Sequence, residues 1–298
     1  MRYDNILQTI GKTPLVRINR IWNDPRVAIW AKLEGWNPMG SVKERPALYM
    51  IEGAERDGTL KKGMTILESS SGNTGIGLAL IGAIKGYPVT ICMPQKVSVE
   101  RRKILLALGA EIVFTSPKGG SDEAWQIAER LHSENPGKYF YAKQYSNQYN
   151  TLSHYEGTAV EIWEELAGQI DVFVIGLGTC GTIMGISRRM KELNSGIKIV
   201  AVEPQRSHTQ QGLRNMDDSR VPELLDWKWI DEKIVISDEE AYQYARRLVR
   251  EEGVFAGISS GTALAGSIHV ARRMIKGNVV TVFPDRADKY FSTPLFDA

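Results

Sequence analysis

Four loops rich in glycine, hydroxyl and amide groups are the parts of this sequence that could carry chemistry. The first, Gly176-Leu-Gly-Thr-Cys-Gly181, has the G-x-G-x-x-G spacing of a dinucleotide-binding loop. Glu203 ends the next predicted strand, where a ribose-binding acid would lie. Backbone N–H groups at a helix start, with the hydroxyls of Thr179 and Thr182, also suit any other phosphate. From this motif alone, a dinucleotide, another phosphate and simple packing glycines all stay open.

The second loop, Ser69-Ser-Ser-Gly-Asn-Thr-Gly75, follows a predicted strand and precedes an apolar stretch of helical length. It is crowded with hydroxyl, amide and backbone donors and carries no net charge, so it suits a carboxylate ligand. The alternative interpretation is an ordinary helix cap, which would need only one of these side chains.

The third loop, Gly257-Ile-Ser-Ser-Gly261, has the G-x-S-x-G spacing of a hydrolase nucleophile. Such a hydrolase needs an acid and then a histidine after its serine, whereas the one downstream histidine, His269, precedes Asp285. The order of residues therefore excludes this class. The structural alternative is that a serine of the loop caps a helix starting near Thr262.

The fourth loop covers Gly35 to Ser41, and its glycine spacing is similar to that of a nucleotide-binding P-loop. Ser41 stands where that pattern needs lysine, so the pattern is broken. Lys43 is then unexplained by this route, and a lone lysine is typically solvated.

Short β-branched runs that end in polar loops and lead into helix-length apolar stretches predict repeated βαβ units and a parallel sheet. We expect strands at 64–67, 88–93, 111–115, 172–175, 198–202 and 278–283, and helices at 73–85, 99–108, 182–193, 238–253 and 262–275. Ser98 and Ser237 are the predicted N-caps. The polar stretch 145–150 predicts a crossover between two α/β domains, with a ligand in the cleft between them.

Composition favours work on small molecules. The 298 residues carry a formal net charge of +2 that is spread along the chain, so neither nucleic acid nor a membrane surface is an expected partner. The two cysteines lack metal-ligand or disulfide spacing, and no metal site is expected. The first residues contain no apolar signal region, and no apolar run has membrane-spanning length, so we expect a cytoplasmic protein.

Over nearly its whole length the sequence resembles the cysteine synthase family of fold-type II pyridoxal-phosphate enzymes, most closely the B-type branch. The segments that carry the resemblance are Gln8–Leu15, Lys32–Arg45, Ser70–Gly75, Gln144–Asn150, Gly178–Thr182, Ser259 and Pro284–Thr293. It implies an α/β fold of two three-layer αβα domains with twisted, mostly parallel sheets, similar to the tryptophan synthase β-subunit. We expect an N-terminal domain at 1–147, with part of 13–34 packed on the other domain, and a C-terminal domain at 148–298.

The resemblance also assigns roles to individual residues. It implies pyridoxal 5'-phosphate bound to Lys43 as a Schiff base, with the lysine amine serving afterwards as the base at the substrate's Cα. Asn73 is implied at the cofactor's phenolic oxygen and Ser259 at its pyridine nitrogen. The residues implied at its phosphate are Gly178, Thr179, Cys180, Gly181 and Thr182. Those implied at the substrate's carboxylate are Ser70, Ser71, Gly72, Thr74 and Gln144.

The implied activity is that of a transferase in cysteine biosynthesis, an O-acetylserine or O-phosphoserine sulfhydrylase that forms L-cysteine by β-replacement. Leu213-Arg-Asn-Met-Asp217 resembles a stretch in which some B-type relatives read a substrate phosphate, so Arg214 is the candidate phosphate ligand and a structural ion pair is its alternative role. Sulfide, thiosulfate and the thiocarboxylate of a carrier protein stay open as sulfur donors. The resemblance implies a homodimer.

Three other functions remain as alternatives. Serine dehydratases and cystathionine-forming enzymes share these loops through the same resemblance. The Gly176–Gly181 loop keeps an NAD-dependent dehydrogenase open. A non-catalytic binder that retained the scaffold is the third.

Overall fold

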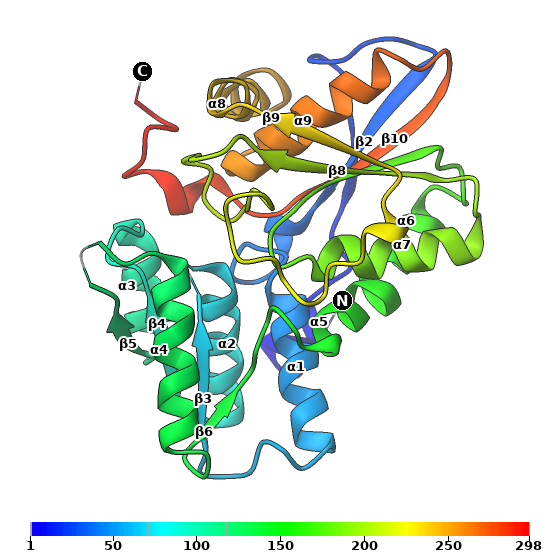
Figure 1. Cartoon of the computed structure of the whole chain (residues 1–298). Helices are drawn as coiled ribbons and strands as arrows, with labels where there is room; N and C mark the ends of the chain where they lie inside the picture. The colour runs from blue at the N-terminus through cyan, green and yellow to red at the C-terminus, as the bar shows by residue number, and fades with distance from the viewer. Residues whose placement is uncertain (1, 71, 117, 298) are drawn as a thin grey trace.

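The computed structural model describes residues 2–70, 72–116 and 118–297, whose strands form two separate sheets (Figure 1). The strands are β1 (Leu15–Ile18), β2 (Val27–Leu33), β3 (Thr65–Ser69), β4 (Val89–Met93), β5 (Glu111–Phe114), β6 (Tyr139–Tyr141), β7 (Val172–Gly176), β8 (Lys198–Pro204), β9 (Glu232–Ile236) and β10 (Gly277–Phe283). The α-helices are α1 (Glu44–Arg56), α2 (Asn73–Lys85), α3 (Val99–Ala107), α4 (Ser121–Glu134), α5 (Gln148–Ser153), α6 (Ala159–Glu165), α7 (Gly181–Leu193), α8 (Asp238–Arg247) and α9 (Ile258–Ala271).

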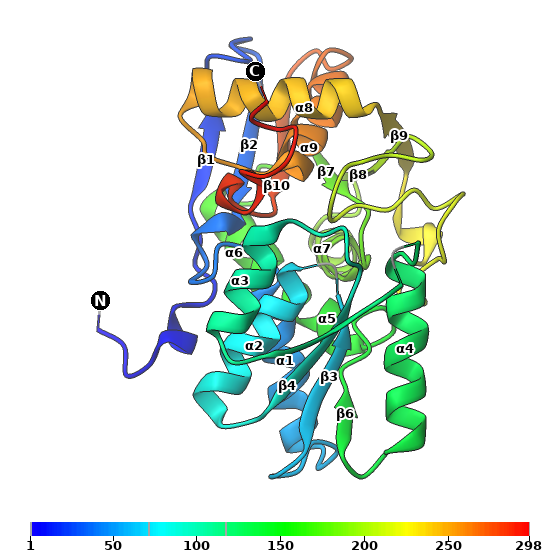
Figure 2. The same cartoon turned by 90° about the vertical axis from the view of Figure 1, so that its left-hand side faces the viewer.

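The smaller sheet has four strands in the order β5-β4-β3-β6, all paired in parallel. Neighbouring residues of β3 point to opposite faces, so Ile66 packs in the cluster that includes α1 and α2, and Leu67 packs against α4. Figure 2 shows α4 on one side of this sheet and α2 and α3 on the other. Burial on both faces explains why its strands are almost continuously apolar.

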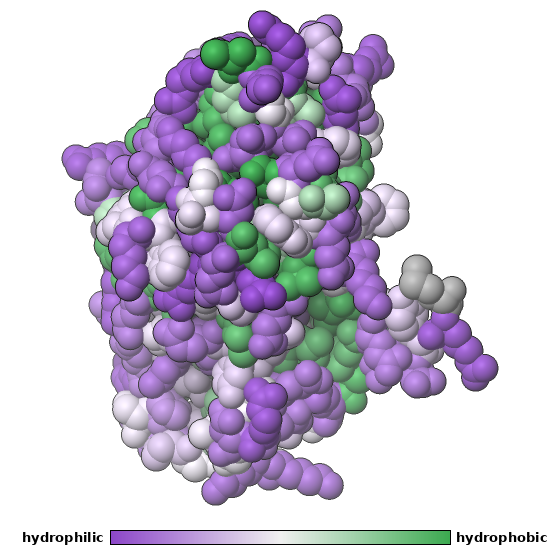
Figure 3. Space-filling model, turned by 90° about the vertical axis from the view of Figure 1, so that its right-hand side faces the viewer, coloured by the Kyte–Doolittle hydropathy of each residue, from purple (hydrophilic) through white to green (hydrophobic). Residues whose placement is uncertain are grey.

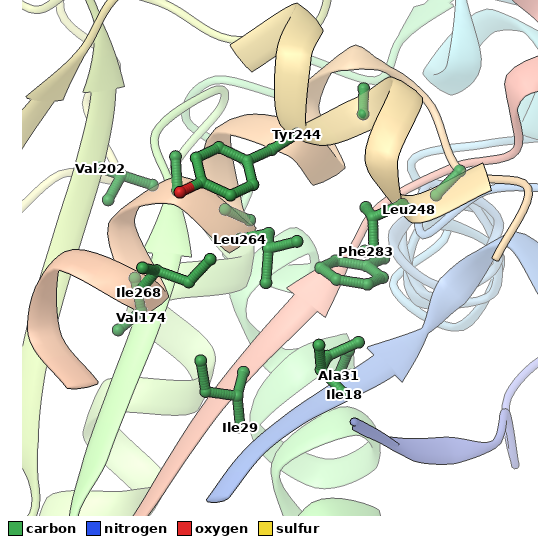
Figure 4. Close-up of a cluster of buried hydrophobic side chains, with 14 of the residues drawn as sticks. Ile18, Ile29, Ala31, Val174, Val202, Tyr244, Leu248, Leu264, Ile268 and Phe283 are labelled. Carbon is green, nitrogen blue, oxygen red and sulfur yellow. The ribbon is translucent and has the colours of Figure 1, made fainter. Parts of the chain in front are cut away.

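The larger sheet has six strands in the order β1-β2-β10-β7-β8-β9, and among the described strands only β1 pairs in an antiparallel way. On one face, Val174 and Val202 pack with Leu264 and Ile268 of α9 (Figure 4). On the other, Phe173 belongs to the cluster formed with α6 and α7. Helices therefore cover both faces of both sheets, which confirms the predicted α/β fold.

Both ends of the chain contribute to the larger sheet. β2 lies directly beside β10 with Leu33 opposite Phe283, although 250 positions separate these residues in the printed numbering. β1 extends the same sheet at its edge. The predicted domain boundary between residues 147 and 148 stays a prediction.

Predicted element positions agree with the structure to within a few residues, with two exceptions at helix ends. The last long helix begins at Ile258, not near Thr262, and Gly257 is its N-cap, so neither serine of this loop caps it. Ser259 and Ser260 lie inside the first turn of α9, where they are buried, so they are part of the helix and do not precede it. The helix after Ser237 leaves α-geometry at Leu248 and continues as a single π-turn to Glu252.

The predicted N-caps differ in outcome. Ser237 accepts a hydrogen bond from the backbone N–H of Glu240, as expected of an N-cap. Ser98 stands at the N-cap position of α3, but its hydroxyl donates to the carbonyl of Lys289 at 2.9 Å and caps nothing. Ser98 therefore ties α3 to the chain's last segment.

A buried network of ion pairs joins β2, α1 and α6. Arg45 donates to Glu34 and Glu161, with Nε–Oε2 and Nη1–Oε1 distances of 2.7 Å. Lys32 contacts Glu161 at 3.0 Å and Glu165 at 2.7 Å. Against the desolvation of burial, the hydrogen bonds from Arg45 lower the pKa of Glu161 to about 2. Because Glu34 is fully buried, its charge depends on Arg45 for compensation.

Arg45→Met should therefore destabilise the protein by about 3–5 kcal/mol, since it leaves Glu34 buried without its cationic partner. The measurement is the free energy of unfolding from urea denaturation at neutral pH. Arg26→Met is the matched control, because the Arg26–Asp24 pair is exposed and should contribute far less to stability than the buried network. Equal losses in the two variants would contradict a special role for the buried network.

Candidate active site

A cavity of about 790 Å³ is lined by residues that follow the carboxyl ends of strands in both sheets. The smaller sheet contributes the segments after β3, β4 and β6, and the larger sheet those after β7, β8 and β10. This is where parallel sheets bind ligands, because strand ends, loops and helix starts meet at one edge. The cavity therefore lies where the sequence placed the ligand.

Most of the candidate site residues meet in this cavity. Its lining includes Lys43, Ser70, Asn73, Thr74, Gln144, Gly178, Thr179, Cys180, Thr182, Arg214 and Ser259. Gly72 and Gly181 belong to the same loops without lining the cavity themselves, and Ser71 lies outside the described residues. Segments far apart in sequence thus converge on one space.

Lys43 occupies the residue directly before α1, and its side chain faces the cavity. Within the described residues, its amine has no hydrogen-bond acceptor and no ion-pair partner. Burial lowers the pKa of Lys43, and the nearby carboxylate of Asp285 opposes that shift. A partly dehydrated amine of lowered pKa is more often neutral, as a nucleophile or base must be.

Glu44 fixes the loop that carries Lys43. Its buried carboxylate accepts hydrogen bonds from the N–H groups of Met39 and Ser41, at 2.9 and 3.0 Å, and from the Ser41 hydroxyl at 2.8 Å. The same hydroxyl oxygen accepts the N–H of Lys43 at 3.2 Å. Lys289, from the chain's last segment, donates to the carbonyl of Gly40 in the same loop. The lysine is therefore held on a well-bonded turn.

The Ser69–Gly75 loop serves partly as a cap and partly as a set of donors. Ser70 Oγ accepts the N–H groups of Gly72 and Gly75, each at 3.1 Å, which is the capping role considered as the alternative. Its O–H still faces the cavity. Thr74 donates to the Gln144 side chain at 2.6 Å, so the loop and the segment after β6 are linked.

Asn73 binds Asp285, a residue that the motifs did not assign to the site. Its amide donates to Asp285 Oδ2 at 2.7 Å, and Tyr290 donates to the same oxygen at 2.7 Å. Asn73 Oδ1 and Asp285 Oδ1 are buried without partners among the described residues. The available signal was position, since Asp285 directly follows the last predicted strand. Buried, unpaired polar atoms facing a cavity favour a polar ligand there.

The residues implied at the cofactor's phosphate, Gly178–Thr182, are called the phosphate loop below. This loop leads into α7, a helix of 13 residues. In the described part of the chain, the backbone N–H groups of 179–182 have no recorded acceptor, as expected at a helix start that receives an anion. A side chain at Gly178 would approach the Gly212 carbonyl within 2.8 Å, and one at Gly181 would come within 2.0 Å of Asn150. These contacts explain both glycines.

Hydroxyl groups complete the phosphate loop. Thr179 accepts from the Asn150 amide at 3.1 Å, and Thr182 Oγ1 lies 3.2 Å from His154 Nε2. Burial, with the positive charge of Lys43, lowers the pKa of His154 well below its usual value, so this ring is neutral. Cys180 has a left-handed backbone (φ 67°), and burial raises the pKa of its thiol to about 12. The loop thus offers neutral donors and backbone N–H groups to an anion.

Ser259 lies in the first turn of α9 and lines the cavity with a hydroxyl that has no hydrogen-bond partner among the described residues. A neutral hydroxyl here could meet a ring nitrogen without giving it a full charge. Ser259, the phosphate loop and the free amine of Lys43 thus fit an aldehyde that carries a phosphate and a pyridine ring.

The structure disfavours the dinucleotide interpretation. Glu203, the expected ribose ligand, is fully buried inside β8. Its carboxylate accepts the N–H of Met216 at 3.0 Å and pairs with Lys233 at 2.6 Å. The carboxylate of Glu203 already has its partners within the protein, so it cannot also hold a ribose in this arrangement.

Arg214 lines the cavity and also contacts two protein side chains. It donates to the Tyr145 hydroxyl at 3.1 Å, contacts Asp122 at 3.4 Å, and lies over the Tyr145 ring at 4.8 Å. Its own N–H donates to the carbonyl of Leu177. These contacts correspond to the structural ion pair that was the alternative to a phosphate ligand.

Two features are absent from the described residues. No helix in them is long and apolar enough to cross a membrane. Over the same ranges, no group of three or more His, Cys, Asp or Glu side chains could hold a metal ion.

Comparison with known proteins identifies relatives over nearly the full length. The family described as "Pyridoxal-phosphate dependent enzyme" matches residues 6–285. A cysteine synthase of Aquifex aeolicus is 43% identical over 301 residues, covering 98% of this chain and 92% of that protein. Cysteine synthase B of Escherichia coli is 40% identical, covering 97% and 95%. The crystal structure of cysteine synthase (OASS) from Entamoeba histolytica has a TM-score of 0.94 at 40% identity, covering 100% of this chain and 92% of the other.

Gly181→Ala should weaken the binding of pyridoxal phosphate by about tenfold or more, because the new Cβ displaces either Asn150 or the loop and overpacking costs about 1–3 kcal/mol. Titration of the apoprotein with the cofactor, followed by absorbance, measures this. Gly137→Ala is the matched control, since no atom lies within 4 Å of its added Cβ. Unchanged affinity in Gly181→Ala would show that the phosphate binds elsewhere.

Proposed function

Because this chain belongs to the pyridoxal-phosphate-dependent enzyme family, we propose that it is a cysteine synthase, which forms L-cysteine from an O-activated L-serine and a sulfur donor. The observation that carries the proposal is one cavity that combines the amine of Lys43 with two loops of uncharged donors. One loop suits a phosphate and the other a carboxylate, which are the two anionic groups that a cofactor-bound amino acid presents.

Several residues would hold the cofactor. The backbone at 178–182, with Thr179 and Thr182, would bind its phosphate, Ser259 would face its pyridine nitrogen, and Asn73 its phenolic oxygen. Lys43 would bind its aldehyde carbon. When bound, the cofactor supplies an electron sink for the bond that breaks at the substrate's Cα.

The protein's own groups then act on the substrate. Ser70, Thr74 and Gln144 orient its carboxylate, which presents the Cα proton to the amine of Lys43. Lys43 Nζ removes that proton, the activated oxygen leaves Cβ, and the sulfur nucleophile adds at the same carbon. A neutral Ser259, in place of a carboxylate, favours this β-chemistry over transfer of the amino group.

The ester that fits the site best is O-acetylserine. Arg214 is already paired with Asp122, so a phosphate dianion beside it would also meet the like charge of that carboxylate. Among the other functions, an NAD-dependent dehydrogenase is disfavoured because Glu203, its expected ribose ligand, is already bound by protein groups. A serine dehydratase or a cystathionine-forming enzyme would be revealed by its product.

We also propose a homodimer in the cytoplasm. The N-terminal segment projects from the body of the molecule (Figure 2), and Figure 3 shows hydrophobic residues gathered beside it on the adjoining face. Such a surface is typical of a subunit interface. The two cysteines, Cys92 and Cys180, are unpaired and buried, in keeping with a reducing compartment.

Lys43→Ala should abolish attachment of the cofactor and lower turnover by about a thousandfold or more, since one residue serves as anchor and base. Borohydride treatment of the wild-type protein should add the reduced cofactor to the peptide that contains Lys43, as read by mass spectrometry. Lys103→Ala, at an exposed position of α3, is the control that should keep both properties. Label on another lysine would refute the assignment.

Arg214→Ala should change the rates with O-acetylserine and O-phosphoserine by the same factor, because the guanidinium holds the wall of the cavity through Tyr145 and Asp122. Single-turnover spectroscopy with each ester measures the two rates. Arg206→Ala, on an exposed pair with Asp217, is the control. A selective loss of more than about tenfold with O-phosphoserine would assign the phosphate to Arg214 and overturn the preference for the acetyl ester.

A further inference from the structure

We propose that Glu68 is a positioning residue that joins the two segments expected to bind the substrate's carboxylate, an inference that rests on the function proposed above. Glu68 is the penultimate residue of β3 and is fully buried. It is absent from the lining of the cavity. Any effect on the substrate must therefore pass through residues that do line it.

Each carboxyl oxygen of Glu68 holds one of the two segments. Oε1 accepts the N–H of Ser69 at 2.8 Å, at the start of the Ser69–Gly75 loop. Oε2 accepts the N–H of Gln144 at 3.0 Å, beyond the end of β6. The Ser69 hydroxyl and the Gln144 amide lie farther from Oε1, at 3.4 and 3.5 Å. The short contacts to backbone groups are therefore the ones that clamp the segments together.

Gln144 carries the clamp to the cavity. Its side chain donates to the carbonyl of Ser69 at 2.6 Å and accepts from the Thr74 hydroxyl at 2.6 Å. Thr74 and Gln144 both line the cavity. With its backbone held by Glu68 and its side chain held at both ends, Gln144 is fixed in place, and so is the Thr74 hydroxyl that it binds, before a substrate arrives.

The surroundings of Glu68 limit its charge. No ion pair involves it within the described ranges, and Cys92 and Tyr141 are its buried neighbours. Burial raises the pKa of Glu68 to about 8, opposed by the hydrogen bonds from Gln144 and Ser69. Burial thus disfavours the charged form of Glu68, while the hydrogen bonds donated by Ser69 and Gln144 favour it.

The test is Glu68→Gln in the holoenzyme, which keeps the shape of the side chain but turns an N–H donor toward one of the two backbone N–H groups. The probes are L-alanine, which has no leaving group on Cβ, and L-alaninamide, which lacks the carboxylate. The change in visible absorbance on binding gives both dissociation constants without turnover. We expect about tenfold weaker binding of L-alanine and unchanged binding of L-alaninamide.

Two further variants make the comparison specific. Glu111→Gln, on the exposed edge strand of the same sheet, should bind both probes as the wild type does. In a Gln144→Ala background, Glu68→Gln should have no further effect on L-alanine, because coupled residues are non-additive. Equal weakening of both probes, unchanged L-alanine binding or an additive double variant would each overturn the proposal. If Glu68→Gln does not fold, Glu68→Asp replaces it, since the shorter arm cannot reach both segments.

The same data distinguish this inference from the proposed function. Wild-type protein that gives no absorbance change with L-alanine, and no labelling of Lys43 by borohydride, would refute the function and the positioning role together. Wild-type protein that binds L-alanine normally, with Glu68→Gln indistinguishable from it, would refute only the positioning role.

Discussion

The parallel pairing of β2 with β10 is the constraint on which the site depends. It sets Leu33 opposite Phe283, so the loop that leads to Lys43 and the segment that contains Asp285 leave the sheet side by side. The N–H of Val42 then donates to the carbonyl of Pro284 at 2.7 Å. This bond fixes Lys43 beside the segment that contains Asp285, the carboxylate that most strongly opposes the lowered pKa of Lys43. The remaining strands bring two helix starts to the same cavity, that of α2 from the smaller sheet and that of α7 from the larger sheet.

Local signals in the sequence were enough for the elements that use them. Strands β3, β4, β5, β7, β8 and β10 and the helices α2, α3 and α7 follow from apolar runs that end at glycine or polar loops, whereas the short β6 and the half-exposed β9 were not predicted. No local signal predicts that β2 pairs with a strand 250 positions away, because strand pairing depends on packing between residues that are distant in sequence. The predicted start of α9 was wrong because Ser259 and Ser260 are typical capping residues in sequence, whereas in the structure they lie within the first turn of the helix.

The candidate site divides along the same line. The loops with a spacing motif could be found from sequence, whereas Asp285, Glu68 and His154 carry no motif and act through contacts made only in the folded chain. A motif alone was not sufficient either. Glu203 fits the dinucleotide pattern in sequence, but in the structure its carboxylate already binds Lys233 and the N–H of Met216. What a polar residue can do is decided by which of its partners are already inside the protein.

The buried thiol of Cys180 has a consequence for an enzyme that handles reduced sulfur. Thiol–disulfide exchange requires a thiolate, and burial raises the pKa of Cys180 to about 12, so the thiol stays protonated at neutral pH. Mixed disulfides with cysteine or with a persulfide are therefore disfavoured at the phosphate loop, even where such molecules are abundant. The loop can carry a cysteine and still be inert to the redox chemistry of its own product.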